Sequence, residues 1–332
     1  MPQARIGRRS ALLAPLLSMA GLPSGAGAQT AAAAPYPTRP IRVVVAWPAG
    51  GGVDTPTRLL APPMGRHLGQ PLVLDNRGGA TGSIGEAEAA RAAPDGYTML
   101  STGLSMATNP MLLRGLSYDP ATAFAPVSEV ARAPLLLVVR ADHPARTLAE
   151  LLDMARASPG RLSYFSSGMV GGPHVTGLTL LRRAGVTATH VSYRGGSQSV
   201  AGLMGGDTDF GFSTLPQAVP LVREGRLRAL GVSSPARMPL LPEVPTIAEQ
   251  GFPGFERFEA VNFWVPAGTP AQAVARLQEA VVVALRDPEV RARLDQLGIT
   301  GVGGTPEELG ASWAAYRAWA AEMIRAEGIR LE

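Results

Sequence analysis

The feature that most constrains the fold of this 332-residue chain is the recurrence of glycine-rich loops after short apolar segments. Residues 40–47 are nearly continuous in β-branched side chains, which is typical of a strand buried on both faces of a parallel sheet. Gly50, Gly51 and Gly52 interrupt this strand, and a helical segment over 55–68 follows. Because the same order recurs along the chain, we expect an α/β fold with mostly parallel sheets flanked by helices.

The remaining elements are expected from the same alternation. Strands are expected over 71–76, 97–101, 135–139, 162–165, 189–193, 209–213, 227–232 and 258–265. Helices are expected over 83–92, 148–157, 174–183, 197–204, 270–286, 288–297 and 305–326. Asp54 is the expected N-cap of the helix over 55–68, and Thr305 with Glu308 predicts a capping box.

The glycine clusters fall mostly at the carboxyl ends of the expected strands, where open α/β sheets bind their ligands. Each loop leads into a helix, whose N-terminus carries partial positive charge. Glycine also lets main-chain amides approach a ligand closely, so the pattern predicts a site for an anion such as a carboxylate. These loops cover residues 48–54, 77–85, 102–103, 166–173 and 194–196.

Composition excludes several chemistries, because all 30 basic residues are arginine and the chain has no cysteine. A P-loop and a Schiff-base enzyme need lysine, and thiolate nucleophiles, iron–sulfur clusters and cysteine-ligated zinc need cysteine. His67, His143 and His190 lie far apart, without the spacing of metal ligands, and are interpreted as structural. We therefore expect neither a metal site nor a cofactor.

Residues 1–28 have the order of a cleaved signal peptide. Arg5, Arg8 and Arg9 precede an apolar run over 11–20, and a small-x-small cleavage pattern ends at Ala28. The arginine pair also resembles a twin-arginine signal, although the usual aromatic residue is missing, so Sec and twin-arginine export both stay open. Cleavage would remove three of the 30 basic and none of the 26 acidic residues, leaving a net charge of +1. The mature chain is expected in the periplasm, with no nucleic-acid partner.

Nine blocks, in order, resemble the tripartite tricarboxylate transporter substrate-binding family, also called Bug receptors. They are YPTRPI (36–41), PAGGGVD (48–54), NRGGATGSIG (76–85), APDGYT (93–98), FAPV (124–127), HVSYRG (190–195), GRLRAL (225–230), PEVPT (242–246) and PAGTP (266–270).

The resemblance implies a monomeric periplasmic solute-binding protein with the type II-like two-lobed fold and a ligand cleft between the lobes. Lobe I would comprise 36–134 plus 262–332 and lobe II 135–261, with crossing strands near 135–139 and 258–265. In the family, main-chain amides of two loops hold a ligand carboxylate, and these loops correspond here to 48–54 and 166–174. The partners implied are a small organic acid and the integral membrane permease subunits of a transporter.

Several expected ligand-binding residues have two possible roles. Asp54 could receive a ligand ammonium or cap its helix, and His174 could line the cleft or make a structural hydrogen bond. Thr102 and Ser105 could donate to a carboxylate or cap a turn. The expected set is Trp47, Ala49, Gly50, Gly51, Gly52, Asp54, Thr102, Ser105, Ser167, Gly168, Gly171, Gly172, His174 and Tyr193.

Met169 and Val170 depart from the family pattern, because they stand where it has small polar residues. This difference predicts a more apolar pocket, suited to an aromatic or branched monocarboxylate.

Two other functions compete with a transport receptor. A sensor that passes the ligand signal to a partner would need the same site, and a serine hydrolase could be built from Ser166 or Ser167 with His174. The nearest match to a nucleophile elbow, over 81–85, has Thr81 in place of the first glycine. The sequence therefore favours a receptor over an enzyme.

Overall fold

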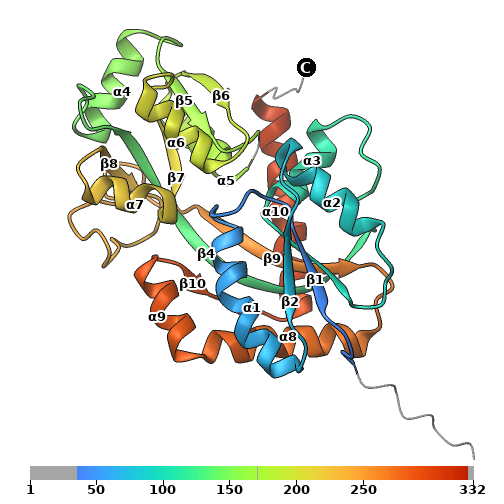
Figure 1. The fold of residues 1–332 in the computed structure, drawn as a ribbon. Helices are drawn as coiled ribbons and strands as arrows, with labels where there is room; N and C mark the ends of the chain where they lie inside the picture. The colour runs from blue at the N-terminus through green and yellow to red at the C-terminus, as the bar shows by residue number, and fades with distance from the viewer. Residues whose placement is uncertain (1–35, 170, 328–332) are drawn as a thin grey trace, which may run out of the picture. The chain divides into compact units, whose positions relative to one another are not determined.

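The computed structural model describes residues 36–169 and 171–327 (Figure 1). The predicted signal peptide and Val170 lie outside the described residues. None of the described helices is both long and apolar enough to cross a membrane.

The first half of the sheet is parallel. Strand β1 (Ile41–Val45) lies between β2 (Leu72–Asn76) and β3 (Thr98–Thr102). Each strand leads into a helix, and these helices are α1 (Asp54–Leu68), α2 (Ser83–Ala90) and α3 (Ser105–Leu112). A short 3₁₀ turn over Ala80–Gly82 precedes α2.

The second half repeats this arrangement. Strand β5 (Ser163–Ser166) lies between β6 (Thr189–Ser192) and β7 (Phe210–Thr214), again in parallel. Its helices are α4 (Leu148–Ala157), α5 (Gly172–Ala184), α6 (Gly196–Gly205) and α7 (Leu215–Arg223), and strand β8 (Leu227–Val232) pairs with β4.

Two antiparallel strands join the halves. The 17-residue β4 (Phe124–Arg140) pairs with β9 (Phe258–Pro266) over residues 124–134 and with β7 and β8 over 135–140. Every antiparallel pair involves β4 or β9, so the sheet is mixed and not mostly parallel as the sequence suggested. The remaining elements are α8 (Ala271–Arg286), α9 (Pro288–Gln296), β10 (Thr300–Gly301) and α10 (Pro306–Glu327).

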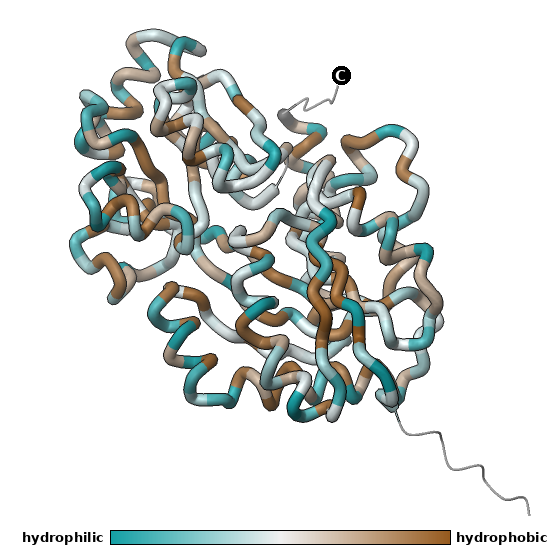
Figure 2. Tube along the Cα trace, viewed as in Figure 1, coloured by the Kyte–Doolittle hydropathy of each residue, from teal (hydrophilic) through white to brown (hydrophobic). Residues whose placement is uncertain are grey.

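Each half has its own hydrophobic core. Ile41, Leu60 and Phe263 are fully buried in the first, and Leu137 and Phe212 in the second. Figure 2 shows hydrophobic residues concentrated along the strands and hydrophilic ones on outward-facing turns. The strand ends that face the opposite half are held in place by these two packed cores.

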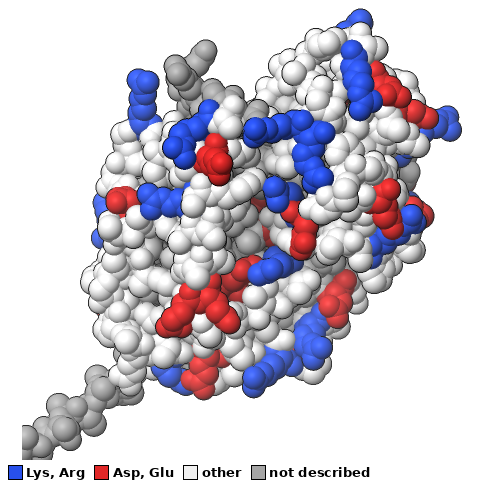
Figure 3. Space-filling model, turned by 180° about the vertical axis from the view of Figure 1, so that it is seen from behind, with Lys and Arg blue, Asp and Glu red and all other residues white. Residues whose placement is uncertain are grey.

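Charges of both signs are mixed over the face shown in Figure 3. Exposed pairs such as Arg237–Glu249 at 2.9 Å and Arg66–Asp287 at 2.8 Å are typical of the surface. Exposed pairs of this kind contribute little to stability, but they cancel the field that clustered arginines would create.

Candidate functional site

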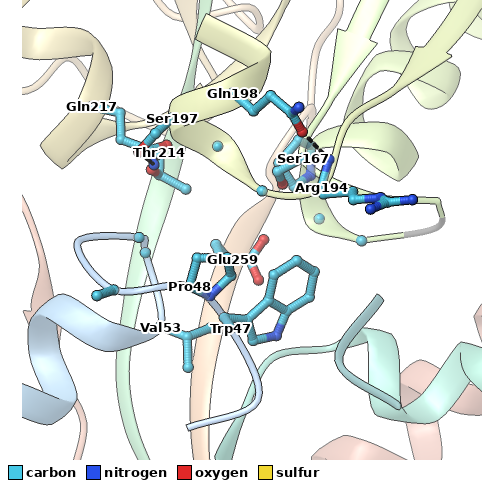
Figure 4. Close-up of a pocket in the computed structure, with 18 residues that line it drawn as sticks. Trp47, Pro48, Val53, Ser167, Arg194, Ser197, Gln198, Thr214, Gln217 and Glu259 are labelled. Atoms are coloured by element: carbon cyan, nitrogen blue, oxygen red, sulfur yellow. Dashed lines mark hydrogen bonds between the residues drawn. The ribbon is translucent and has the colours of Figure 1, made fainter. Parts of the chain in front are cut away.

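A cavity of about 350 Å³ lies where the loops after β1, β5, β6 and β7 meet (Figure 4). Its volume suits a small molecule. Its walls are formed by Trp47, Pro48, Ala49, Gly51, Gly52, Val53, Ser167, Gly171, Gly172, Pro173, Arg194, Gly195, Gly196, Ser197, Gln198, Thr214, Gln217 and Glu259.

Four helices begin at this cavity. Val53, Gly171, Gly195 and Thr214 are the N-caps of α1, α5, α6 and α7, and all four line it. The first main-chain amides of a helix have no partner within the helix, and its dipole places partial positive charge there. The cavity is therefore built to attract an anion without a buried cationic side chain.

Asp54 holds the first glycine loop in place. The residue is 1% exposed, and its Oδ2 accepts a hydrogen bond from the Gly50 amide at 2.8 Å. Its Oδ1 accepts from Arg58 at 2.8 Å and from Asn76 at 2.9 Å. Burial alone would raise the pKa of Asp54, but these hydrogen bonds outweigh it and lower the pKa overall.

The predicted N-cap role of Asp54 is wrong. The N-cap is Val53, and Asp54 lies in the first turn with its carboxylate turned back to the loop. Asp54 does not line the cavity, and its contact with the Gly50 amide holds the loop that does.

The first loop touches the second half across the cavity. A Cβ on Gly52 would lie 2.8 Å from Thr214 Cγ2, and a Cβ on Gly195 would lie 3.1 Å from Pro48 Cγ. Both distances are shorter than normal carbon contacts, so only glycine allows the backbones to approach this closely. These strand-end glycines thus allow the two halves to fit together.

With this geometry in place, comparison with known proteins identifies the family. The family model for the tripartite tricarboxylate transporter family receptor matches residues 57–311. This chain belongs to that receptor family. The UPF0065 protein in the tcbD-tcbE intergenic region of Pseudomonas sp. (strain P51) is 39% identical over 307 residues, covering 92% of this chain and 90% of the relative.

Two solved structures are similar to this receptor. The periplasmic binding protein BugD is 32% identical, with a TM-score of 0.83, over 89% of this chain and 100% of that one. R. palustris Rpa4515 with adipate is 33% identical, with a TM-score of 0.85, over 89% of this chain and 100% of that one. The Bug resemblance and the two-lobed periplasmic binding protein fold are confirmed, and the protein is a solute-binding receptor of this family.

Seven of the expected ligand-binding residues line the receptor's cavity. They are Trp47, Ala49, Gly51, Gly52, Ser167, Gly171 and Gly172. The other seven lie outside the lining: Gly50, Asp54, Thr102, Ser105, Gly168, His174 and Tyr193.

His174 is packed against a second histidine behind the loop. It is 4% exposed and stacks on His190 with ring centroids 3.8 Å apart. Burial, followed by the neighbouring His190, lowers the pKa of His174 to about 3, and burial lowers that of His190 to about 4. Both rings are therefore neutral at physiological pH and support the loop.

Ser166, one of the two serines of the alternative hydrolase, bonds to a histidine other than His174. Ser166 is fully buried, and its Oγ lies 2.8 Å from His190 Nε2 and 2.8 Å from the Gly168 carbonyl oxygen, to which it donates. Neither Ser166 nor His190 lines the cavity. This pair fixes the turn after β5.

Thr102 and Ser105 stand at the expected strand end but are turned away from the cavity. The Thr102 hydroxyl donates to Glu86 at 2.8 Å, and Asn109 and Tyr118 donate to the same carboxyl group. Burial raises the pKa of Glu86 despite these bonds. Ser105 is 1% exposed, so its hydroxyl is also inside the protein.

Gly50, Gly168 and Tyr193 are positioned by other contacts. The Gly50 amide is used by Asp54, and the Gly168 carbonyl accepts from Ser166. The Tyr193 ring packs so tightly on Gly202 that a Cβ there would lie 2.2 Å from its hydroxyl oxygen.

Met169 does not make the cavity apolar. It packs beside Leu112, Val175, Met323 and Ile324, in a cluster between α3, α5 and α10. The sequence argument for an apolar pocket therefore fails for Met169, and Val170 lies outside the described residues.

Sequence reasoning missed several polar lining residues. Arg194 lies in the predicted loop 194–196 but not in the expected ligand-binding set, and Ser197, Gln198, Thr214, Gln217 and Glu259 are also absent from that set. The Gln198 side chain accepts from the Arg194 amide at 2.9 Å, and Thr214 Oγ1 donates to Gln217 at 2.8 Å. Two features of the sequence could have pointed to Thr214 and Glu259. Thr214 directly follows the expected strand 209–213, and Glu259 is a single acid near the start of the apolar strand 258–265.

In residues 36–169 and 171–327, no group of three or more His, Asp or Glu side chains could hold a metal ion. Two side-chain hydrogen bonds at the wall, from Thr214 to Gln217 and from the Arg194 amide to Gln198, join wall residues to one another.

Proposed function

We propose that this receptor works in the periplasm as a monomer, captures a small organic carboxylate in the 350 Å³ cavity, and delivers it to the membrane subunits of a tripartite tricarboxylate-type transporter. The observation that carries the proposal is the convergence of four helix N-termini on one cavity. The first 28 residues would direct export and be removed.

Capture would rely on main-chain amides. Gly51 and Gly52 from the first half and Gly171, Gly172 and Gly196 from the second present backbone to the cavity with no side chain in the way. Hydrogen bonds to a carboxylate are stronger than neutral ones, and preorganised amides lose little entropy when they bind. The adipate bound to the similar R. palustris protein supports an organic acid as the ligand class.

Closure would bring these two sets of amides together. We assign lobe I to 36–134 plus 262–332 and lobe II to 135–261, with β4 and β9 as the connection. The contact of Gly52 with Thr214 is then a contact between lobes, and a ligand enclosed there would hold them closed.

The proposal is tested with a matched pair of alanine variants. A Cβ on Gly171 would meet nothing closer than 3.7 Å, so Gly171→Ala adds a methyl group at the cavity wall without strain. Gly205, at the end of α6, has open space around its Cβ and does not line the cavity, so Gly205→Ala is the control.

Calorimetric titration with a panel of mono- and dicarboxylates, adipate included, should give 1:1 binding for at least one acid, recovered unchanged. G171A should weaken this binding about tenfold with an unchanged Tm, and G205A should leave it as in the wild type. The proposal fails if no acid binds, if the bound acid is converted, or if both variants bind like the wild type.

A further inference from the structure

Glu259 is the acidic side chain in the wall of the cavity. It projects from β9 and is 9% exposed. Figure 4 shows its carboxyl group between the Trp47 indole and the loop that carries Ser167. Its Oε2 atom is buried and has no hydrogen-bond partner among the described residues.

The carboxyl group is enclosed by backbone from both halves. A Cβ on Gly172 would lie 2.1 Å from Glu259 Oε2, and a Cβ on Gly103 would lie 2.8 Å from Oε1. A side chain at either glycine would force the carboxyl group out of this position. The described residues thus leave room for this acid but give its Oε2 atom no donor.

Other buried acids of this protein are provided with donors. Glu86 accepts hydrogen bonds from Thr102, Asn109 and Tyr118, and Asp54 accepts from Arg58, Asn76 and the Gly50 amide. Glu259 has no such set, and burial alone raises its pKa to about 7. Its titratable neighbour is Tyr316 of α10, whose pKa is raised by burial and then by Glu259.

We propose that Glu259 makes the cavity selective for acids that also carry a hydrogen-bond donor, an ammonium or a hydroxyl group, and selects against a second carboxylate. This inference rests on the proposed function. A buried carboxyl without a donor is costly, and a ligand that brings the donor removes this cost. A carboxylate in the same place would face a like charge.

The two kinds of donor differ in their fit to the site. An ammonium group would pair with the Glu259 charge and would also lie beside the Trp47 indole, a ring that attracts cations. A hydroxyl group would satisfy Oε2 without neutralising the charge. The ammonium acid should therefore bind more tightly than the hydroxy acid.

A matched four-carbon set tests this selectivity. The acids are butanoate, 2- and 4-aminobutanoate, 2- and 4-hydroxybutanoate, and succinate, titrated calorimetrically at pH 8, where Glu259 is ionised. Wild-type protein should bind at least one amino or hydroxy acid about tenfold more tightly than butanoate and succinate. Glu259→Gln should remove this preference and strengthen succinate several-fold, whereas Glu256→Gln, an exposed acid three residues earlier, should behave as wild type.

The outcomes separate this inference from the proposed function. If butanoate or succinate binds as tightly as every donor-bearing acid, or if E259Q keeps the wild-type ranking, the inference is wrong and the acid receptor stands. If no acid in this set or the wider panel binds, both are wrong. The wild-type ranking decides by itself should E259Q fail to fold.

Discussion

The contact between Gly52 and Thr214 allows a direct test of how the two halves meet. Gly52→Ala would place a Cβ 2.8 Å from Thr214 Cγ2, about 1 Å inside a normal carbon contact. Overpacking of this size costs about 1–3 kcal/mol. Because the two residues belong to different halves, slight opening of the cavity relieves the clash, and the cost falls on ligand binding.

The second substitution removes the clashing methyl group. Thr214→Ser keeps the hydroxyl that donates to Gln217 and leaves the Thr214 Cβ, at 3.4 Å, as the nearest atom. G52A should therefore weaken binding by roughly 5- to 150-fold, and the G52A/T214S double variant should recover most of the loss.

The assay is a double-mutant cycle with an acid that binds the wild type, measured by calorimetric titration, with Tm recorded for each variant. T214S alone should bind almost as the wild type does. Wild-type affinity in G52A, or a double variant no better than G52A, would show that the halves do not meet through this contact when ligand is bound.

Two further predictions concern the buried acids. Asp54→Asn should lower the free energy of unfolding by about 1–3 kcal/mol in urea titrations, because it removes the charge-assisted hydrogen bond from Arg58. It should also weaken ligand binding, because the Gly50 loop is held less firmly. Unchanged stability and affinity would contradict this prediction. The free energy of unfolding of the wild type, measured relative to that of E259Q, should fall by about 3 kcal/mol as the pH rises from 4.5 to about 7. The reason is that the Glu259 carboxyl group ionises near pH 4.5 in the unfolded chain but keeps its proton to about pH 7 in the folded protein. Parallel stability curves for the two proteins would refute the second prediction.

Much of the fold follows from local sequence. The alternation of apolar strands, glycine loops and helices gave β1 to β3 and β5 to β7 within a few residues of their observed bounds. This works because a buried parallel strand is continuously apolar and its loop needs positive φ or close backbone approach.

The first part of β4 and helices α3 and α7 were not predictable from local sequence, because they contain proline or depend on pairing with distant strands. Strand β4 begins at Phe124, but Pro126 and Pro134 make its first part unlike a typical strand sequence. Its register with β9 also shifts after Pro126. Helices α3 and α7 were not expected, and both contain proline, Pro110 in α3 and Pro220 in α7. Tertiary packing overrides the local preference against proline there.

The site was predictable at the level of loops but not of side chains. Glycine placement identified the loops after β1, β5 and β6, because glycine is needed where a side chain would block the close approach of other atoms to the backbone. It could not show that Thr102 turns inward to Glu86, or that Glu259 from β9 reaches the cavity. Those facts depend on how two distant segments pack.

The central claim is that main-chain amides at converging helix N-termini hold a small organic acid. A crystal structure of the protein with the acid that binds most tightly tests it most directly. The account predicts carboxylate oxygens within about 3 Å of main-chain nitrogens in at least two of the loops that end at Val53, Gly171, Gly195 and Thr214. An acid bound outside this cavity, or held in it by arginine side chains alone, would contradict the account.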